Sequence, residues 1–274
     1  MTSTAALAGW DRPLLLIGCG NMAGAILARW LETGLSPNLV HVVDPARPAL
    51  ANGITVDTAL PDSIAPGTFV LIGIKPQHFG GVGADLNARL GANCTVLSIM
   101  AGLPLDLVRK SLPNAGRLVR LMPNLPVRTG EGVVLTVAEA PGDEMVNRLL
   151  APLGLVESLA SEADFDLGTA LSGCGPAYVY RFIDALTVAA SRLGLEEAQA
   201  ARLALQTVAG AASAVSHSIQ SPAAMADAVA SPGGMTRLGM DVLDADERLV
   251  QLLTDTLRAA RDRGAELAAA TLSA

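Results

Sequence analysis

Gly18 and Gly20 directly follow a run of apolar residues, Leu14–Ile17. If residues 22–31 form a helix, the order is that of a buried strand, a tight turn and a helix N-terminus. Gly18 would allow the turn, Gly20 would let the backbone approach a pyrophosphate, and Ala23 occupies the third small position of the pattern. The free N–H groups of the helix favour phosphate charge. The stretch predicts a dinucleotide-binding unit, and a glycine-rich turn without a ligand is the alternative.

A candidate second strand, residues 39–43, ends at Asp44, which lies 24 residues after Gly20. A carboxylate at this place accepts a hydrogen bond from the ribose 2′-hydroxyl of NAD. Arg47, three residues later, could instead meet the 2′-phosphate of NADP. A solvent-exposed Asp-Pro-Ala-Arg turn is equally open, so this pattern leaves the choice of cofactor undecided.

Further apolar runs alternate with short helical segments, which indicates a parallel sheet covered on both faces. Ligands bind such sheets at the carboxyl ends of the strands. Residues Lys75-Pro76 and Met100-Ala101, which follow two of these strands, are therefore expected at the same edge as Gly18 and Asp44. The expected strands are 55–56, 69–74, 94–99, 118–121 and 132–137, with helices at 104–111 and 143–150.

From about Ser161 the pattern changes to long Ala- and Leu-rich helical periodicity. We therefore place a domain boundary between residues 160 and 161, with a dinucleotide-binding domain at 1–160 and a helical domain at 161–274. The predicted fold class is an α/β parallel-sheet domain followed by an all-α domain. Its helices are expected at 162–171, 174–193, 196–218, 222–230 and 246–269.

Two stretches of the helical half are rich in glycine and proline. Residues 171–178 contain Gly173, Gly175 and Pro176, which are expected to break one helix and allow a close backbone approach. Residues 230–236 contain Gly233 and Gly234 before another helical run, where free N–H groups could hold a carboxylate. A plain turn without a ligand is the alternative for both stretches.

The composition limits the classes of partner. The net charge of −7 argues against nucleic acid or an anionic membrane as a main partner. The cysteines, Cys19, Cys94 and Cys174, have no metal-site spacing, and a reducing cytoplasm is the expected compartment. No signal peptide is expected, and the uncharged stretch 203–226 is interpreted as a helix buried in protein, which favours an oligomer.

The acid–base residues are few. The lysines are Lys75 and Lys110, and the histidines are His41, His78 and His217. A hydroxyacid dehydrogenase normally needs a lysine or histidine to move the alcohol proton, and the helical half contains no lysine. Reduction of an imine fits better, because a protonated C=N accepts hydride without a strong enzyme acid. The sequence shows no serine–histidine–aspartate set and no Walker loop.

Six motifs, in one order along nearly the whole chain, resemble the Δ1-pyrroline-5-carboxylate reductase family. The motifs are residues 17–22, 73–77, 98–102, 120–126, 171–178 and 231–236. The resemblance implies a Rossmann-type domain followed by a helical dimerisation domain. It also implies hydride transfer from a nicotinamide cofactor to a pyrroline ring, which gives L-proline. NADPH is the expected cofactor, with NADH possible.

The resemblance assigns site residues by position. The expected cofactor-binding residues, with Asp44 and Arg47 from the strand argument above, are Ile17, Gly18, Cys19, Gly20, Asn21, Met22, Gly73, Ile74, Lys75, Pro76, Met100 and Ala101. The expected substrate-binding residues are Ser231, Gly233, Gly234, Met235 and Thr236. Backbone amides of this group would hold the carboxylate, and the Thr236 hydroxyl would place the ring nitrogen as the catalytic contact. No metal site is expected.

The resemblance further implies a homodimer through the helical domain, with a decamer of five dimers possible and part of the site supplied by the second subunit. Cys174, Ala230 and Met235 depart from the usual family residues, which puts the shape of the substrate pocket in question. A related cyclic-imine reductase, a 3-hydroxyacid-type dehydrogenase and a dinucleotide-sensing protein without catalysis are the alternative functions.

Overall fold

A computed structural model describes residues 5–51, 53–140 and 142–272 of the 274-residue chain. Its tertiary contacts divide the chain into two compact units, residues 1–174 with 260–274 and residues 175–259. This division differs from the predicted domain boundary after residue 160, since Phe165 is fully buried in a core of the sheet. The boundary itself stays a prediction.

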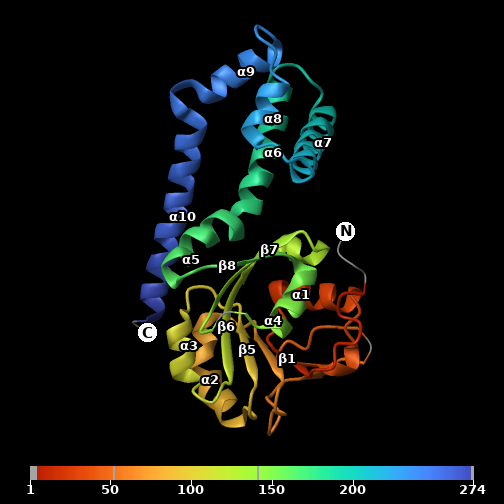
Figure 1. Ribbon diagram of the computed structural model, residues 1–274, viewed down its shortest axis with the longest axis vertical. Coiled ribbons are helices and arrows are strands. Elements are labelled where there is room, and N and C mark those ends of the chain that lie inside the picture. The colour runs from red at the N-terminus through yellow and green to blue at the C-terminus, as the bar shows by residue number, and fades with distance from the viewer. Residues whose placement is uncertain (1–4, 52, 141, 273–274) are drawn as a thin grey trace. The chain divides into compact units, whose positions relative to one another are not determined.

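The first unit is built on an eight-stranded sheet in the order β3-β2-β1-β4-β5-β6-β7-β8 (Figure 1). Strands β1 to β6 pair in parallel, and β8 pairs in parallel with β7. The predicted Rossmann-type sheet is therefore confirmed. The strands are β1 Leu14–Ile17, β2 Val40–Val43, β3 Thr55–Asp57, β4 Phe69–Ile72, β5 Thr95–Ser98, β6 Arg117–Pro123, β7 Gly132–Ala138 and β8 Gly154–Ser158.

The pairing of β6 with β7 corrects the expectation of a parallel sheet throughout. These strands run antiparallel, with Val119 opposite Ala138. A parallel pair needs a crossover connection of roughly a dozen residues or more. Only residues 124–131 join β6 to β7, and they form the short 3-10 helix Leu125–Thr129. The chain must therefore reverse direction.

Residues of β1 alternate between two cores. Leu14 and Leu16 pack with helices α1, Asn21–Glu32, and α4, Glu144–Leu150. Leu15 and Ile17 pack with α2, Phe79–Arg89, and α3, Leu105–Ser111, on the other face of the sheet (Figure 1). Because successive strand residues point to opposite faces, a strand covered by helices on both faces must be apolar throughout. This explains the continuous apolar runs.

Helix α2 and strand β8 of the first unit were not predicted from the sequence. Helix α2 contains Gly80, Gly81 and Gly83, and each glycine disfavours a helix by about 1 kcal/mol relative to alanine. Burial of Phe79 and Leu86 against the sheet offsets that cost. Strand β8 lies at the edge of the sheet and is largely exposed, so it lacks an apolar run.

The segment after β8 corrects the expected helix break. The chain passes through a 3-10 turn, Glu162–Asp164, then α5, Phe165–Gly168, and a π-helical turn, Thr169–Gly173. Cys174 keeps helical dihedral angles (φ −85°, ψ −23°), and its N–H donates to the Thr169 carbonyl. The wider π turn thus carries the glycine-rich stretch directly into the next helix.

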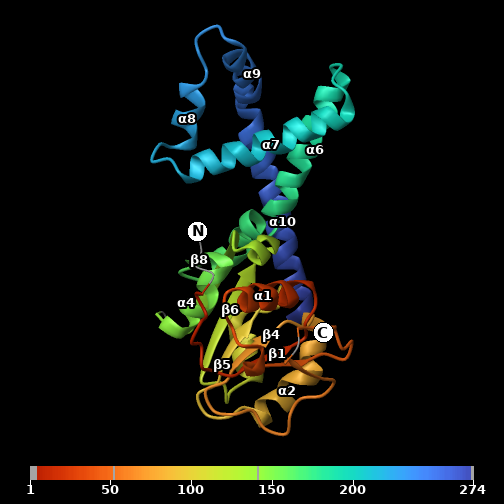
Figure 2. The same ribbon diagram turned by 90° about the vertical axis from the view of Figure 1, so that its right-hand side faces the viewer.

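The second unit contains helices, in agreement with the predicted all-α half. They are α6 Gly175–Arg192, α7 Glu197–Ser216, α8 Pro222–Ala228, α9 Met235–Asp244 and the first part of α10 Arg248–Leu272. Helices α6 and α7 pack against each other (Figure 2). Large apolar side chains remain exposed on this unit, among them Val179, Phe182, Leu203, Leu238 and Val242. Such faces usually mark protein interfaces.

Two general findings concern function. Over the part of the chain that is described, no helix combines the length and apolarity needed to cross a membrane. Within the same residues, no group of three or more His, Cys, Asp or Glu side chains is placed to hold a metal ion.

Candidate active site

Gly18 forms the turn between β1 and α1 in a conformation that favours glycine. Its φ is +82°, and an added Cβ would lie 2.8 Å from Ile74 Cγ2 and 3.0 Å from the Gly73 carbonyl carbon. The Gly18 N–H donates to the Val43 carbonyl at 2.8 Å. A side chain at this position is therefore excluded both by the backbone conformation and by the loop that follows β4.

Gly20 is the N-cap residue of α1, and the space around it is open. An added Cβ would have no atom within 4 Å, and no side chain caps the helix. Gly73 lies against the same helix, since its added Cβ would be 2.9 Å from Ala23 Cβ. A bare helix N-terminus with free space above a glycine suits a pyrophosphate, because N–H groups and the helix dipole both face it. The residues present thus fit a dinucleotide.

Asp44 is joined to the glycine turn by a direct contact. Its Oδ2 accepts from the Cys19 N–H at 2.7 Å, and its Oδ1 accepts from the Ala46 N–H at 2.8 Å. Burial and the charge of Asp44 raise the pKa of the Cys19 thiol. Arg47 is exposed, with φ +47°, and its N–H donates to the Asp44 carbonyl at 3.0 Å. The two predicted ribose-side residues therefore share one tight turn at the end of β2.

The loops after β4 and β5 meet at a pocket of about 500 Å³ in the first unit. Pro76 and Ala101 line it as the predicted cofactor residues of these loops, and Cys174 from the glycine-rich stretch lines it too. Met122 of β6 and Leu267 of α10 supply apolar wall. Four of the sequence motifs, far apart in the chain, are thus brought together at one cavity.

Several other predicted cofactor residues do not line this pocket. The side chains of Ile17 and Met100 are buried in the sheet core, at 3% and 1% exposure, so only their backbone is available to a ligand. Asn21 and Met22 begin α1. Lys75 is exposed at the start of the 3-10 helix Pro76–His78, where its carbonyl accepts from the His78 N–H.

Arg120 is a pocket residue that the sequence argument assigned no role, although it opens one of the quoted motifs. It is 3% exposed, forms an ion pair with Glu162, and lies 3.7 Å from the ring centre of Phe165. Burial lowers the pKa of its guanidinium, against the opposing charge of Glu162. Thr169, with a buried hydroxyl that has no hydrogen-bond partner in the described residues, lines the same pocket.

In the second unit, Ser231, Pro232, Gly233 and Gly234 form a tight turn. Pro232 precedes Gly233 at φ +70°, and the Gly234 N–H donates to the Ser231 carbonyl at 2.9 Å, as in a type II turn. Gly234 is then the N-cap of α9, without a side-chain cap.

The two residues that open α9 are exposed, which leaves the start of the helix accessible. Met235 is 93% exposed, and Thr236 follows it in the first turn. The Arg237 guanidinium donates to the Asp227 carboxylate at 2.8 Å, which links α9 to α8. The backbone amides at the start of α9 are thus presented by a well-defined turn.

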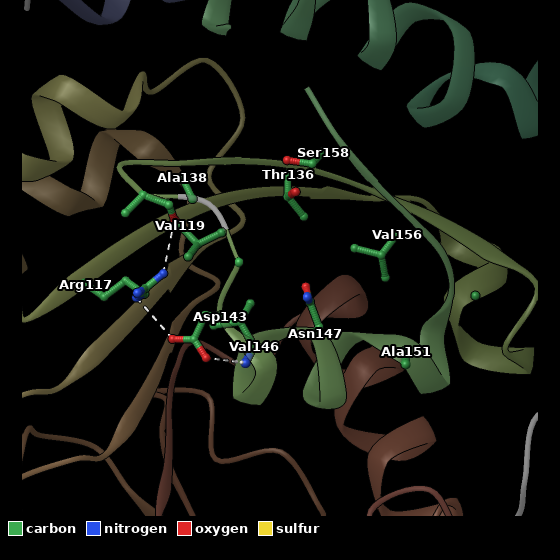
Figure 3. A pocket seen from close by; sticks show the side chains of 13 residues that line it. Arg117, Val119, Thr136, Ala138, Asp143, Val146, Asn147, Ala151, Val156 and Ser158 are labelled. Atoms are coloured by element: carbon green, nitrogen blue, oxygen red, sulfur yellow. Dashed lines mark hydrogen bonds and ion pairs between the residues drawn. The ribbon is translucent and has the colours of Figure 1, made fainter. Parts of the chain in front are cut away.

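A second cavity, of about 530 Å³, lies between α4 and the strands β6, β7 and β8 (Figure 3). Arg117 and Asp143 form an ion pair at 3.1 Å in its wall, and Asp143 also accepts from the Met145 and Val146 N–H groups that open α4. None of the predicted site residues lines this cavity. Its charged groups serve the helix cap.

Comparisons with known proteins identify relatives of this chain. The family model for pyrroline-5-carboxylate reductase dimerisation matches residues 162–267, and the model described as NADP oxidoreductase coenzyme F420-dependent matches residues 14–102. The Pseudomonas aeruginosa pyrroline-5-carboxylate reductase is 32% identical over 69% of this chain and 72% of its own length. The Staphylococcus aureus enzyme is 28% identical over 93% of this chain and 97% of its own length.

A solved structure extends the similarity over both units. The pyrroline-5-carboxylate reductase from Coxiella burnetii is 30% identical, covers 93% of this chain and 98% of its own, and superposes with a TM-score of 0.82. Sequence motifs, fold and relatives lead to one conclusion: the chain belongs to the pyrroline-5-carboxylate reductase family.

Proposed function

We propose that the protein is an NAD(P)H-dependent oxidoreductase that reduces the C=N bond of 1-pyrroline-5-carboxylate to give L-proline. NADPH is the expected hydride donor, with NADH possible. A nicotinamide cofactor bound to the protein would supply a hydride to the imine carbon of the ring (C2 of the pyrroline), while the protonated ring nitrogen keeps its proton and becomes the amine. The observation that carries the proposal is the single pocket formed by Pro76, Ala101 and Cys174.

The chain's residues have separate tasks in this proposal. The Gly18–Gly20 turn and the N-terminus of α1 hold the pyrophosphate. Pro76 and Ala101 shape the pocket for the nicotinamide, and apolar walls exclude water from it. Catalysis then rests mainly on orientation, which can remove about 7–11 kcal/mol of barrier in favourable cases.

The small number of lysines and histidines in the sequence supports an imine substrate. His41 is paired with Asp57 at 2.9 Å, and His217 contacts the Ser213 carbonyl at 2.8 Å on α7. The helical half of the sequence contains no lysine. A reaction whose substrate already carries the proton requires no such residue.

We assign the substrate carboxylate to the turn Ser231–Gly234 and the first amides of α9. Anions are stabilised at a helix N-terminus, and this helix has no side-chain cap that would compete. Thr236, in the first turn, is assigned the hydrogen bond that orients the ring nitrogen. Ser231, Gly233, Gly234 and Met235 complete the proposed substrate site.

The protein forms a homo-oligomer in this proposal, with a dimer through the helical domain and a decamer of five dimers as the larger assembly. The exposed apolar side chains of α6, α7 and α9 support an interface there. Light scattering on the purified protein measures the assembly, and a monomer at micromolar concentration would contradict it. We place the enzyme in the cytoplasm, where its three cysteines stay reduced.

The activity test uses purified protein, each of the two reduced cofactors, and pyrroline-5-carboxylate or its six-membered homologue. Oxidation of the cofactor is followed at its absorption band, and proline is identified as the product. The proposal expects faster turnover of the five-membered ring. Turnover of neither ring with either cofactor would refute it.

A further inference from the structure

The carboxylate of Asp44 is fixed beside the glycine turn by the fold itself. Asp44 is the first residue after β2, and its N–H donates to the Asp57 carbonyl at 2.8 Å. The neighbouring strand β1 ends at the Gly18–Gly20 turn, whose middle N–H, that of Cys19, donates to Asp44 Oδ2. Main-chain contacts on both sides therefore determine where this negative charge lies.

Each carboxylate oxygen has one backbone donor and free acceptor capacity. Oδ2 is 2.7 Å from the Cys19 nitrogen, and Oδ1 is 2.8 Å from the Ala46 nitrogen. A carboxylate offers about four acceptor positions, so about two remain. The two hydroxyls of an unmodified adenosine ribose can donate to them, which is the role of the acidic residue that follows the second strand in NAD-binding sheets.

The same carboxylate disfavours the 2′-phosphate of NADPH. A phosphate cannot donate the hydrogen bond in its ionised form, and like charges a few ångströms apart repel. Arg47 is the counter-charge on the same turn. Its side chain is exposed and forms no ion pair or hydrogen bond within the described residues, and the Arg47 N–H donates to the Asp44 carbonyl.

We propose that Asp44 makes this enzyme a dual-cofactor reductase that binds NADH at least as tightly as NADPH, with Arg47 supplying the affinity that remains for NADPH. The inference rests on the proposed function for the reaction, but it concerns dinucleotide binding alone. Asp44 is thus the residue that sets the ratio between the two cofactors, and Arg47 acts on NADPH only.

The test measures dissociation constants of NADH and NADPH by calorimetry on the full-length protein, without substrate. Asp44→Asn keeps the size of the side chain and an oxygen for Cys19 while it removes the charge. It is expected to weaken NADH binding at least tenfold and to leave NADPH binding equal or tighter. Arg47→Gln is expected to weaken NADPH about tenfold and to change NADH less than twofold.

The control is Asp62→Asn, which removes the same charge from a fully exposed loop position. It is expected to change neither constant by more than twofold. The pair 2′,5′-ADP and ADP, titrated in the same way, isolates the ribose site from the nicotinamide. Melting temperatures check that each variant folds, and the exposed Arg47 variant keeps the test decisive if Asp44→Asn unfolds.

Three results would overturn the inference. They are wild-type protein that binds NADPH more tightly than NADH, a ratio of the two dissociation constants that Asp44→Asn leaves unchanged, and equal effects of Arg47→Gln on both cofactors. Turnover separates the two proposals. Protein that shows the expected binding ratios but does not reduce the pyrroline supports the role of Asp44 and refutes the proposed reaction. Normal turnover of the pyrroline, with a ratio of the NADH and NADPH dissociation constants that Asp44→Asn leaves unchanged, supports the proposed reaction and refutes the role of Asp44.

Discussion

Arg120 and Glu162 are joined by an ion pair that links β6 to the segment after β8. The Arg120 side chain is 4% exposed and the Glu162 side chain 33% exposed. The second oxygen of Glu162 accepts from the Leu105 N–H, at the start of α3, at 2.9 Å. One carboxylate therefore neutralises a buried charge and anchors the loop that carries Ala101 into the pocket.

We expect Glu162→Gln to destabilise the protein by about 2–3 kcal/mol, because it leaves the buried guanidinium of Arg120 without a counter-charge. Glutamine keeps an oxygen that can accept from the Leu105 N–H, so the loss of stability measures the effect of removing the Glu162 charge. Urea unfolding measures the change. The control Asp184→Asn breaks the exposed pair with Arg181 and should change stability by less than about 1 kcal/mol. Equal effects in both variants would contradict a buried pair.

Glu139 gives a pH prediction. Hydrogen bonds from Arg109 hold the pKa of the Glu139 carboxyl below its ordinary value in the folded state. A depressed folded pKa stabilises the protein above the unfolded value, and the contribution is lost as the pH falls through the folded one.

The free energy of unfolding of the wild-type protein should therefore exceed that of Glu139→Gln by about 1 kcal/mol at neutral pH. This difference should disappear as the pH falls into the acid range. Unfolding curves at several pH values measure it. A gap that does not vary with pH would contradict the argument, and Glu266→Gln, in an exposed helix pair, is the control.

The two glycines of the turn should respond differently to alanine. Gly18→Ala places a Cβ 2.8 Å from Ile74 at a positive φ, and should cost about 1–3 kcal/mol of folding stability. Gly20→Ala meets no atom within 4 Å and should change stability by less than about 1 kcal/mol.

The methyl group of Gly20→Ala instead occupies the space above the N-terminus of α1, so the affinity for a dinucleotide should fall at least tenfold. Thermal melts and calorimetry check both expectations. Tight cofactor binding by Gly20→Ala would show that the phosphate lies elsewhere.

Thr236→Ala should lower kcat/KM about 100-fold, which corresponds to about 2.7 kcal/mol of transition-state stabilisation. The residue is exposed at the start of α9, so the variant should fold normally. Cys174→Ser, a change in the pocket wall, should stay within about threefold because a similar volume and a hydrogen-bonding group remain. Initial-rate kinetics compare the two variants. The reverse ranking would move the catalytic contact away from Thr236.

Glu247 lies at φ +54°, beside Asp246 at φ +55°. A left-handed backbone costs a residue with a Cβ roughly 1–2 kcal/mol, and glycine avoids this cost at some loss of chain entropy. Glu247→Gly should therefore raise the free energy of unfolding by about 0.5–1 kcal/mol. Glu247→Ala is the matched control and should give no gain. Equal effects would mean that the side chain, not the backbone, decides stability here.

Local features of the fold were predictable because their causes lie within a few residues. The Gly18 turn, the apolar runs of β1, β4 and β5, and the Pro232–Gly233 turn each follow from backbone conformation and side-chain periodicity over short stretches. The fold class and the sheet edge at which the Gly18 turn and Asp44 lie follow from the order of these elements along the chain.

The sequence by itself determined the dinucleotide turn and the helical second half, and the tertiary structure decided the rest through long-range contacts. Asp44 meets Cys19 across 25 residues, and Arg120 meets Glu162 across 42. Each pairing depends on which strands become neighbours, and no local pattern encodes that choice. The Gly18–Gly20 turn and the placement of Asp44 at the same sheet edge were therefore visible in the sequence, whereas the hydrogen bond from the Cys19 N–H to Asp44 and the ion pair of Arg120 with Glu162 appear only when the sheet is assembled.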